Sequence, residues 1–176
     1  MQVPKNITHK LWMTRKSVKW GIALTISVAI LGGMLFSCYQ GETITTHYLN
    51  WAGVKQDEAV ERGWIPAFLP TSSTNIFEQH NIDSNCGVIA FSATPSDLIS
   101  LAASLEEVPA NRFQEIGPCL MSKESWWPSE LRNRHLQDLV ENGEFKIYAK
   151  TNGSAQEPVN WYFAINRQKG VGFAWH

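Results

Sequence analysis

The N-terminal part of this sequence lacks charge of one sign, and then lacks charge altogether. Residues 1–41 contain no acidic side chain, and residues 20–39 contain no charged side chain of either sign. Five basic residues precede the uncharged run: Lys5, Lys10, Arg15, Lys16 and Lys19. Helices in globular cores normally keep a polar, charged face. The run is therefore interpreted as a membrane-inserting segment rather than as part of a soluble core.

Several chemical signatures are missing from the rest of the chain. There is no internal repeat, no glycine-rich phosphate loop and no Gly-x-Ser-x-Gly nucleophile elbow. Five of the 15 basic residues and none of the 16 acidic residues lie in residues 1–38, which leaves ten basic against 16 acidic residues, a net charge of −6, beyond them. Nucleic-acid binding requires a positive surface, so nucleic acid is excluded as a partner.

The uncharged run of residues 20–39 is long enough to cross a bilayer. At about 1.5 Å per residue, a helix of this length spans about 30 Å, the thickness of the hydrocarbon core. Because the basic residues all precede the run, residues 1–19 are expected to stay in the cytoplasm as a basic arm. Residues 40–176 are then exported to the periplasm or the cell surface, attached to a transmembrane anchor.

The end of the run supports a second interpretation, a cleaved secretory signal. The sequence Leu35-Phe36-Ser37-Cys38 resembles the bacterial lipoprotein lipobox, with leucine three residues before the cysteine and a small residue directly before it. The resemblance implies lipid on Cys38 and removal of residues 1–37, although Phe36 departs from the usual small or branched residue. Both interpretations, a retained anchor and a lipoprotein, attach residues 40–176 to the outer side of a membrane.

The chain has three cysteines, Cys38, Cys86 and Cys119. If Cys38 is lipidated or lies in the bilayer, Cys86 and Cys119 remain as a pair in an oxidising compartment, where a disulfide can form. The alternative is that both are buried, unpaired small hydrophobic residues, and the sequence does not supply the Cα separation that would decide.

Residues 40–176 have the length of one ordinary domain, and their pattern predicts the α+β class. Two prolines four residues apart make residues 63–70 an extended arm rather than a helix. Helices are expected over residues 51–62, 75–80 (one short turn), 95–108 and 129–141. Strands are expected over residues 88–93, 145–150, 161–166 and 171–175, with a hairpin loop at 167–170. We expect a small antiparallel sheet with the helices packed on one face.

The segment over residues 62–91 resembles the opening of a family of uncharacterised bacterial membrane-attached envelope proteins with a Gly-Trp-Ile-Pro motif. The strands within residues 161–175 are similar to that family's closing hairpin. The resemblance implies a small envelope domain and adds no activity. The positions that carry it are Gly63, Trp64, Ile65, Pro66, Pro70, Ser72, Ile76, His80, Asp83 and Asn85.

His80, Asp83 and Cys86 are spaced at intervals of three and are the most suggestive chemical group in the chain. They could bind a metal or supply a nucleophile and its base, which would make the protein a small extracytoplasmic hydrolase or a thiol or metal enzyme. A structural zinc site needs four ligands, and a thiol enzyme needs a third group that orients the histidine. The sequence supplies neither, so no cofactor is predicted and the enzyme is the alternative interpretation.

Six tryptophans in the exported part exceed what a core of this size requires. Adjacent residues at a helix start cannot easily both face inward, so Trp126 and Trp127, together with Trp64, are candidate partner-binding residues. Aromatic faces stack on sugars and anchor protein interfaces. The sequence therefore favours a non-catalytic, membrane-anchored domain that binds an envelope protein or a cell-wall glycan.

Overall fold

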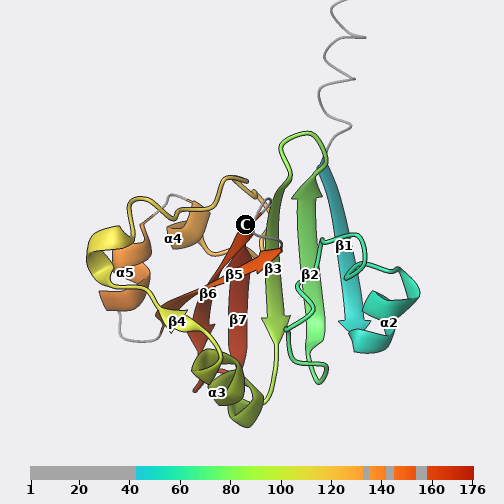
Figure 1. Cartoon of the computed structure of the whole chain (residues 1–176), viewed down its shortest axis with the longest axis horizontal. Helices are drawn as coiled ribbons and strands as arrows, with labels where there is room; N and C mark the ends of the chain where they lie inside the picture. The colour runs from blue at the N-terminus through green and yellow to red at the C-terminus, as the bar shows by residue number, and fades with distance from the viewer. Residues whose placement is uncertain (1–42, 133–134, 142–144, 154–157) are drawn as a thin grey trace, which may run out of the picture. The chain divides into compact units, whose positions relative to one another are not determined.

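A seven-stranded antiparallel sheet with strand order β1-β2-β3-β7-β6-β5-β4 is the centre of the fold (Figure 1). This computed structural model describes residues 43–132, 135–141, 145–153 and 158–176. The strands are β1 (Thr43–Asn50), β2 (Thr74–Asn81), β3 (Cys86–Ser92), β4 (Glu106–Glu107), β5 (Lys146–Gly153), β6 (Pro158–Asn166) and β7 (Val171–Trp175). The helices are α2 (Trp51–Gln56), α3 (Pro95–Ala103), α4 (Ser129–Arg132) and α5 (Leu136–Glu141), with a 3₁₀ turn η1 (Ala110–Arg112).

In the described ranges, no helix combines the length and the apolar character needed to cross a membrane. The uncharged run at 20–39, the basic arm at 1–19 and Cys38 lie outside these ranges. The anchor and the lipoprotein signal therefore both stay predictions.

The helices begin where the sequence provides caps. The Asn50 side chain accepts a hydrogen bond from the backbone N–H of Ala52 at 3.0 Å and so opens α2 directly after β1. At α3, the Thr94 hydroxyl accepts from the N–H of Asp97 at 3.2 Å, and Pro95 occupies the first turn, where its missing N–H costs nothing.

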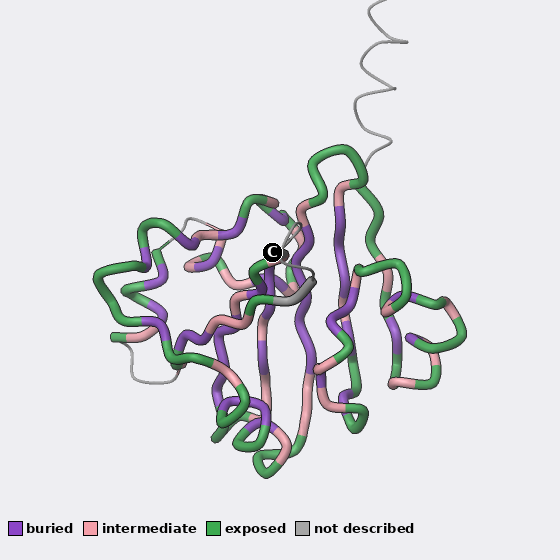
Figure 2. Tube along the Cα trace, in the orientation of Figure 1, coloured by how far each residue is buried: buried purple, intermediate pink, exposed green. Residues whose placement is uncertain are grey.

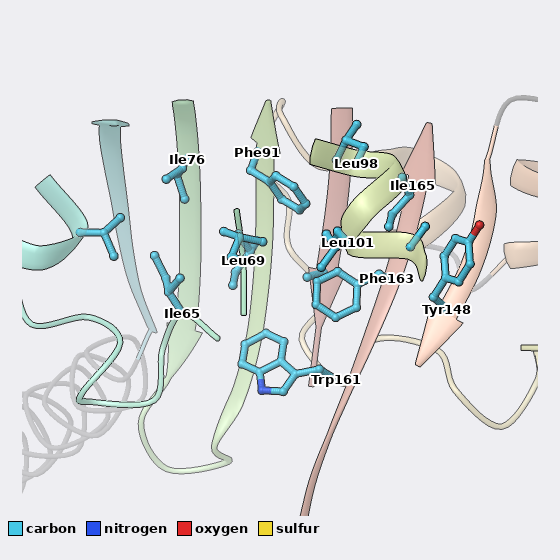
Figure 3. Close-up of a cluster of buried hydrophobic side chains, with 14 of the residues drawn as sticks. Ile65, Leu69, Ile76, Phe91, Leu98, Leu101, Tyr148, Trp161, Phe163 and Ile165 are labelled. Carbon is cyan, nitrogen blue, oxygen red and sulfur yellow. The ribbon is translucent and has the colours of Figure 1, made fainter. Parts of the chain in front are cut away.

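One face of the sheet is covered by the extended arm (residues 63–70) and by α3. Phe163 of β6 is fully buried there, with Ile65 and Leu69 of the arm beside β2 and β3, and Leu98 and Leu101 of α3 over the central strands (Figure 3). We call this the arm face. Burying apolar area is favourable by about 25 cal/mol per Å², so these contacts are the main attachment of the arm.

The other face of the sheet is covered by α4, α5 and the segment before them. Its cluster contains Trp127, Leu131 and Leu136, packed over Ile147 of β5 and Trp175 of β7. The indole N–H of Trp175 donates to the backbone oxygen of Ile116 at 2.6 Å, which fixes that segment to the sheet. We call this the helix-pair face.

The α+β class with an antiparallel sheet is confirmed. The helices, which were expected on one face, cover both. The reason lies in the central strands: neighbouring residues such as Ile147 and Tyr148 are both buried, on opposite faces, so each face needs its own cover.

Two local predictions in the first half are wrong. Residues 75–80, expected as a helical turn, belong to β2, and the helix expected over 51–62 ends at Gln56. In β2 the buried face carries Ile76, Glu78 and His80, so polar residues hide the alternation that marks a strand. The closing hairpin lies where expected, and Gly170 in its loop has φ 68°, a backbone conformation that glycine adopts without strain.

Candidate functional site

Strand β1 forms one edge of the sheet, and β2 is its neighbour within it. The pairing with β2 runs from Thr43 opposite Asn81 to Asn50 opposite Thr74. Within the described residues, no strand pairs with the other side of β1 (Figure 1). An edge strand presents a row of backbone N–H and C=O groups that can pair with another chain.

The sequence of β1 is Thr-Ile-Thr-Thr-His-Tyr-Leu-Asn, which contains no charged residue, no proline and no glycine. Most of β1 is exposed (Figure 2). Six of its eight residues are exposed, and the exposed fraction of Leu49 is 70%. Proteins normally protect a long edge strand with lysine, proline, a bulge or very short length. The irregularity in this region lies in β2, between Thr74 and Phe77, and not in β1. Among the described residues, β1 is therefore a long edge strand that carries none of these protective features.

Side-chain contacts hold β1 in a fixed position. Tyr48 is buried, and its hydroxyl donates to the Asp57 carboxylate at 2.6 Å; burial, and then this carboxylate, raise the pKa of Tyr48. On the opposite side of the strand, Gln79 donates to the hydroxyl of Thr45 at 2.8 Å. The His47 ring stacks on Phe77 of β2 with ring centroids 4.0 Å apart. These contacts anchor β1 to its neighbours, and no strand of the described residues pairs with its outer side.

The opposite edge of the sheet, β4, has the protection that β1 lacks. It has two residues, Glu106 and Glu107, and both are exposed and acidic. The Lys146 ammonium of β5 lies 3.0 Å from each carboxylate oxygen of Glu107, so the ion pair sits at the edge itself.

A buried polar cluster lies one strand in from β1, on the arm face. Glu78 is fully buried, and its Oε1 lies 2.7 Å from Nδ1 of His80, which is 4% exposed. Burial raises the pKa of Glu78 to about 8, with a further contribution from Asp57, and burial lowers the pKa of His80. Near neutral pH the pair therefore holds one proton and has no net charge. Within the described residues, Glu78 Oε2 and His80 Nε2 have no hydrogen-bond partner.

A second histidine extends this cluster across the sheet. His80 pairs in register with Gly87 of β3, and a Cβ at Gly87 would lie 2.5 Å from Nε2 of His176. The His176 ring thus occupies the space that a side chain at residue 87 would fill, and it packs against Trp161 at 4.3 Å between ring centroids. Burial, and then the nearby His80, lower the pKa of His176 to about 4.

The predicted group of His80, Asp83 and Cys86 is not assembled into a site. Cys86 forms a disulfide with Cys119, with the Cα atoms 5.9 Å apart, so its sulfur is not a thiolate. Asn81 pairs with Cys86 and His80 pairs with Gly87, so Cys86 and His80 project from opposite faces of the sheet. Asp83 is exposed in the turn between β2 and β3. Across the described ranges, no three or more His, Cys, Asp or Glu side chains are placed to hold a metal ion.

The three candidate tryptophans have different surroundings. Trp127 is 2% exposed in the helix-pair cluster, which corrects its assignment as a surface partner-binding residue: Trp126 takes the outer position and Trp127 the inner one. Trp126 is half-buried and stacks on Phe77 at 5.6 Å between centroids. Trp64 is half-buried and stacks on His80 at 4.0 Å, with the Arg62 guanidinium 4.8 Å from its ring centroid.

Two hollows on the surface lack the features of an active site. One of about 580 Å³ is lined by His135 and Asp138, which lie 3.3 Å apart but are both more than half exposed. Another of about 350 Å³ lies between the arm and α3, where Asp97 accepts hydrogen bonds from Ser72 and Thr94 that lower its pKa. A carboxylate that two hydroxyl donors hold ionised in the first turn of α3 is unsuited to proton transfer near neutral pH.

Residues 42–92 match the family model of the YbbD head domain. The YbbD head domain is a family of bacterial proteins, and the match runs from the start of β1 to the end of β3. It includes the open edge, the arm and the Glu78–His80 pair, whereas His176 and β4 lie outside it. No curated protein matches the chain, and neither does any solved structure.

Sequence reasoning missed β1 and the buried pair. The signal for β1 was present, since four of the six residues from Thr43 to Tyr48 are β-branched and one is tyrosine, a composition typical of strands. Glu78 gave no signal, because a glutamate in a polar stretch is normally exposed. Among the residues singled out, His80 and Trp64 are brought together, and so are Cys86 and Cys119.

Proposed function

We propose that this chain is a membrane-attached protein of the bacterial envelope whose exported domain is non-catalytic and binds another envelope protein by strand addition to β1. The observation that carries the proposal is the difference between the two sheet edges: β1 has eight residues, none charged and six exposed, whereas β4 has two residues, both glutamate. The match of residues 42–92 to a bacterial head domain and the uncharged run at 20–39 support the envelope location. We propose export with the N-terminus cytoplasmic, unless cleavage precedes a lipidated Cys38.

The chemistry of β1 defines the kind of partner. In strand addition, backbone hydrogen bonds supply affinity and alternate side chains supply specificity. The partner segment would lie beside Thr45, His47 and Leu49 on one face, so uncharged, β-branched or apolar residues suit it best. Because residues 39–176 carry a net charge of −6, basic residues flanking that segment would favour the encounter. A cell-wall glycan fits this edge less well, because the edge offers mainly backbone N–H and C=O groups spaced to pair with another strand.

Site-specific photocrosslinking in intact cells tests the proposal. The photoreactive residue p-benzoylphenylalanine is placed at Leu49, which is 70% exposed on β1, and in a matched variant at Glu106, which is exposed on β4. We expect a protein adduct from position 49 and none from position 106. Equal adducts at both edges, no adduct from β1, or an adduct that muramidase digestion removes would contradict strand addition of a protein.

A further inference from the structure

The buried polar cluster joins segments that are far apart in the sequence. Glu78 and His80 come from β2, His176 follows β7, and the ring of Trp64 from the arm covers His80. Trp64 is the only ring that the described structure stacks on His80. The Trp64 end of the arm is therefore one of the covers of the His80 imidazole, and the His176 ring lies on its β3 side.

The cluster is arranged to be neutral. Two of its buried atoms, Glu78 Oε2 and His80 Nε2, have no hydrogen-bond partner among the described residues. An unpaired buried polar atom costs on the order of a lost hydrogen bond, and an unpaired buried charge costs far more. With one proton shared between Glu78 and His80 the cluster is neutral and can stay buried. A further proton adds a positive charge, which makes burial of the cluster unfavourable.

The charged groups around His80 do not offset such a charge. His176 lies across the sheet, and charge repulsion between the two rings disfavours their being protonated together. Above Trp64 lies the Arg62 guanidinium, which is also positive. The carboxylate of Asp57, which acts electrostatically on Glu78, accepts a hydrogen bond from Tyr48 and lies 3.7 Å from Arg62, so its charge is already paired. The charge on a protonated His80 would therefore be stabilised more by water than by the groups around it.

We propose that Glu78, His80 and His176 form an acid-sensitive latch that holds the Trp64 end of the arm on β2 at neutral pH and releases it on acidification. Release lifts Trp64 from His80 and exposes the imidazole to water, where it takes up a proton. The rest of the arm stays attached, because Ile65 and Leu69 are buried at 1% and 2% exposure in the arm-face cluster. The latch is independent of any partner at β1, so a failure of strand addition leaves it untouched.

Hydrogen–deuterium exchange of the full chain in detergent micelles measures the latch. Exchange of the arm peptide is compared at about pH 7 and about pH 5, after correction for intrinsic exchange rates. Because opening lets one histidine return to its ordinary pKa while Glu78 stays buried and keeps its proton, the open fraction should rise by up to about tenfold for each pH unit below about 6.5. Peptides from β6 and β7 should stay protected at both pH values.

The variants are the double substitution His80→Gln/His176→Gln and the control His135→Gln, whose histidine is exposed and lies away from β1 and the cluster. Glutamine at position 80 can still bond to Glu78 but does not titrate. We expect the first variant to lose the acid response and the control to keep it. An acid response that persists in the first variant, or an arm that opens equally at both pH values in the wild type, overturns the proposal.

If the double variant does not fold, titration of the histidines in the wild-type protein still tests the latch. In the wild-type protein, NMR of the histidine rings should give His80 and His176 pKa values below the ordinary histidine value of about 6.5. If His80 and His176 titrate at the ordinary value of about 6.5 while the fold is intact, the cluster is not a latch.

Discussion

The two edge strands of this sheet differ in length, in charge and in the residues of the strand next to them. β1 has eight residues, none charged, and the adjacent strand β2 carries the buried Glu78 and His80. β4 has two residues, both glutamate, and the adjacent strand β5 supplies Lys146 to pair with Glu107. The β4 edge has both short length and charge, two of the features by which soluble proteins prevent edge-to-edge association.

The open edge is therefore a property of one side of the sheet only. At the other edge, two glutamates and one lysine are enough to protect the strand, and β1 has no comparable charged residues. The match to the YbbD head domain covers β1 and ends before β4. The unprotected edge therefore belongs to the part of the chain that resembles other proteins.

The largest effect is expected when β1 receives charge. The double substitution Thr45→Lys/Leu49→Lys places two ammonium groups on the open edge, which disfavours the pairing of a further strand. Protein adducts formed from β1, with the photoreactive residue moved to Thr43, should fall by tenfold or more. The control Ile99→Lys/Ala103→Lys adds the same charge at exposed positions of α3 and should leave the adducts unchanged.

A loss of adducts in both double variants would mean that net charge, and not the edge, governs binding. Circular dichroism of each variant checks that the sheet is intact, since Thr45→Lys also removes the hydrogen bond that Gln79 donates to Thr45.

The next largest effect is expected in the pH dependence of the free energy of unfolding, which should distinguish the β1 side of the sheet from the β4 side. The pKa of Glu78 is raised to about 8 in the fold, so its stabilising contribution is complete below its unfolded value near 4.5 and is lost as pH rises through 8. The contribution of His176, whose pKa is lowered to about 4, is present above about 6.5 and is lost as pH falls through 4. Above pH 6.5 only the Glu78 effect operates within this cluster.

Between about pH 6.5 and 8, the free energy of unfolding of the wild type should fall by about 1.4 kcal/mol per pH unit, or about 2 kcal/mol in all. Glu78→Gln keeps a hydrogen bond to His80 without the titration and should remove this decline. Urea unfolding at several pH values measures it. A Glu78→Gln variant that keeps the wild-type slope would show that another group causes the decline, and Glu107→Gln at the β4 edge should keep it.

Tyr48 tests the attachment of β1 to the end of α2. Tyr48→Phe removes the hydroxyl that donates to Asp57 at 2.6 Å and leaves the buried ring in place. A hydrogen bond to a charged, partly exposed acceptor contributes about 1 to 2 kcal/mol, so the free energy of unfolding should fall by that amount. Tyr162→Phe on β6, where no hydroxyl contact of this kind is described, serves as the control and should change stability by less than about 0.5 kcal/mol.

The second half of the sheet was predictable because its strands follow ordinary rules. Trp161, Phe163 and Ile165 alternate with the smaller or more polar residues between them, and a glycine-ended loop separates β6 from β7. The start of α3 also follows from local chemistry, with Thr94 as cap and Pro95 in the first turn, whereas its end was predicted wrongly: the helix expected to residue 108 ends at Ala103. These elements are determined mainly by neighbours in the sequence.

The first half was less predictable because tertiary contacts decide it. Glu78 and His80 occupy inward positions of β2, where the alternation rule expects apolar residues, so the strand looked like a polar turn. The disulfide stood as one of two alternatives, since only the fold brings the Cα atoms of Cys86 and Cys119 to 5.9 Å. Which of two adjacent tryptophans is buried likewise depends on Phe77, a residue 49 positions earlier that stacks on Trp126.

The smallest effect is expected at β4, and it tests whether charge alone keeps that edge closed. Glu106→Thr/Glu107→Thr removes both carboxylates and the ion pair with Lys146, which is exposed and worth about 0 to 1 kcal/mol. The free energy of unfolding should change within that range. No protein adduct should appear from a photoreactive residue at the exposed Lys146, because a two-residue strand offers too few backbone groups for another strand to pair. If such adducts did appear, charge would be the only barrier at β4, and the length of β1 would no longer explain why that edge binds.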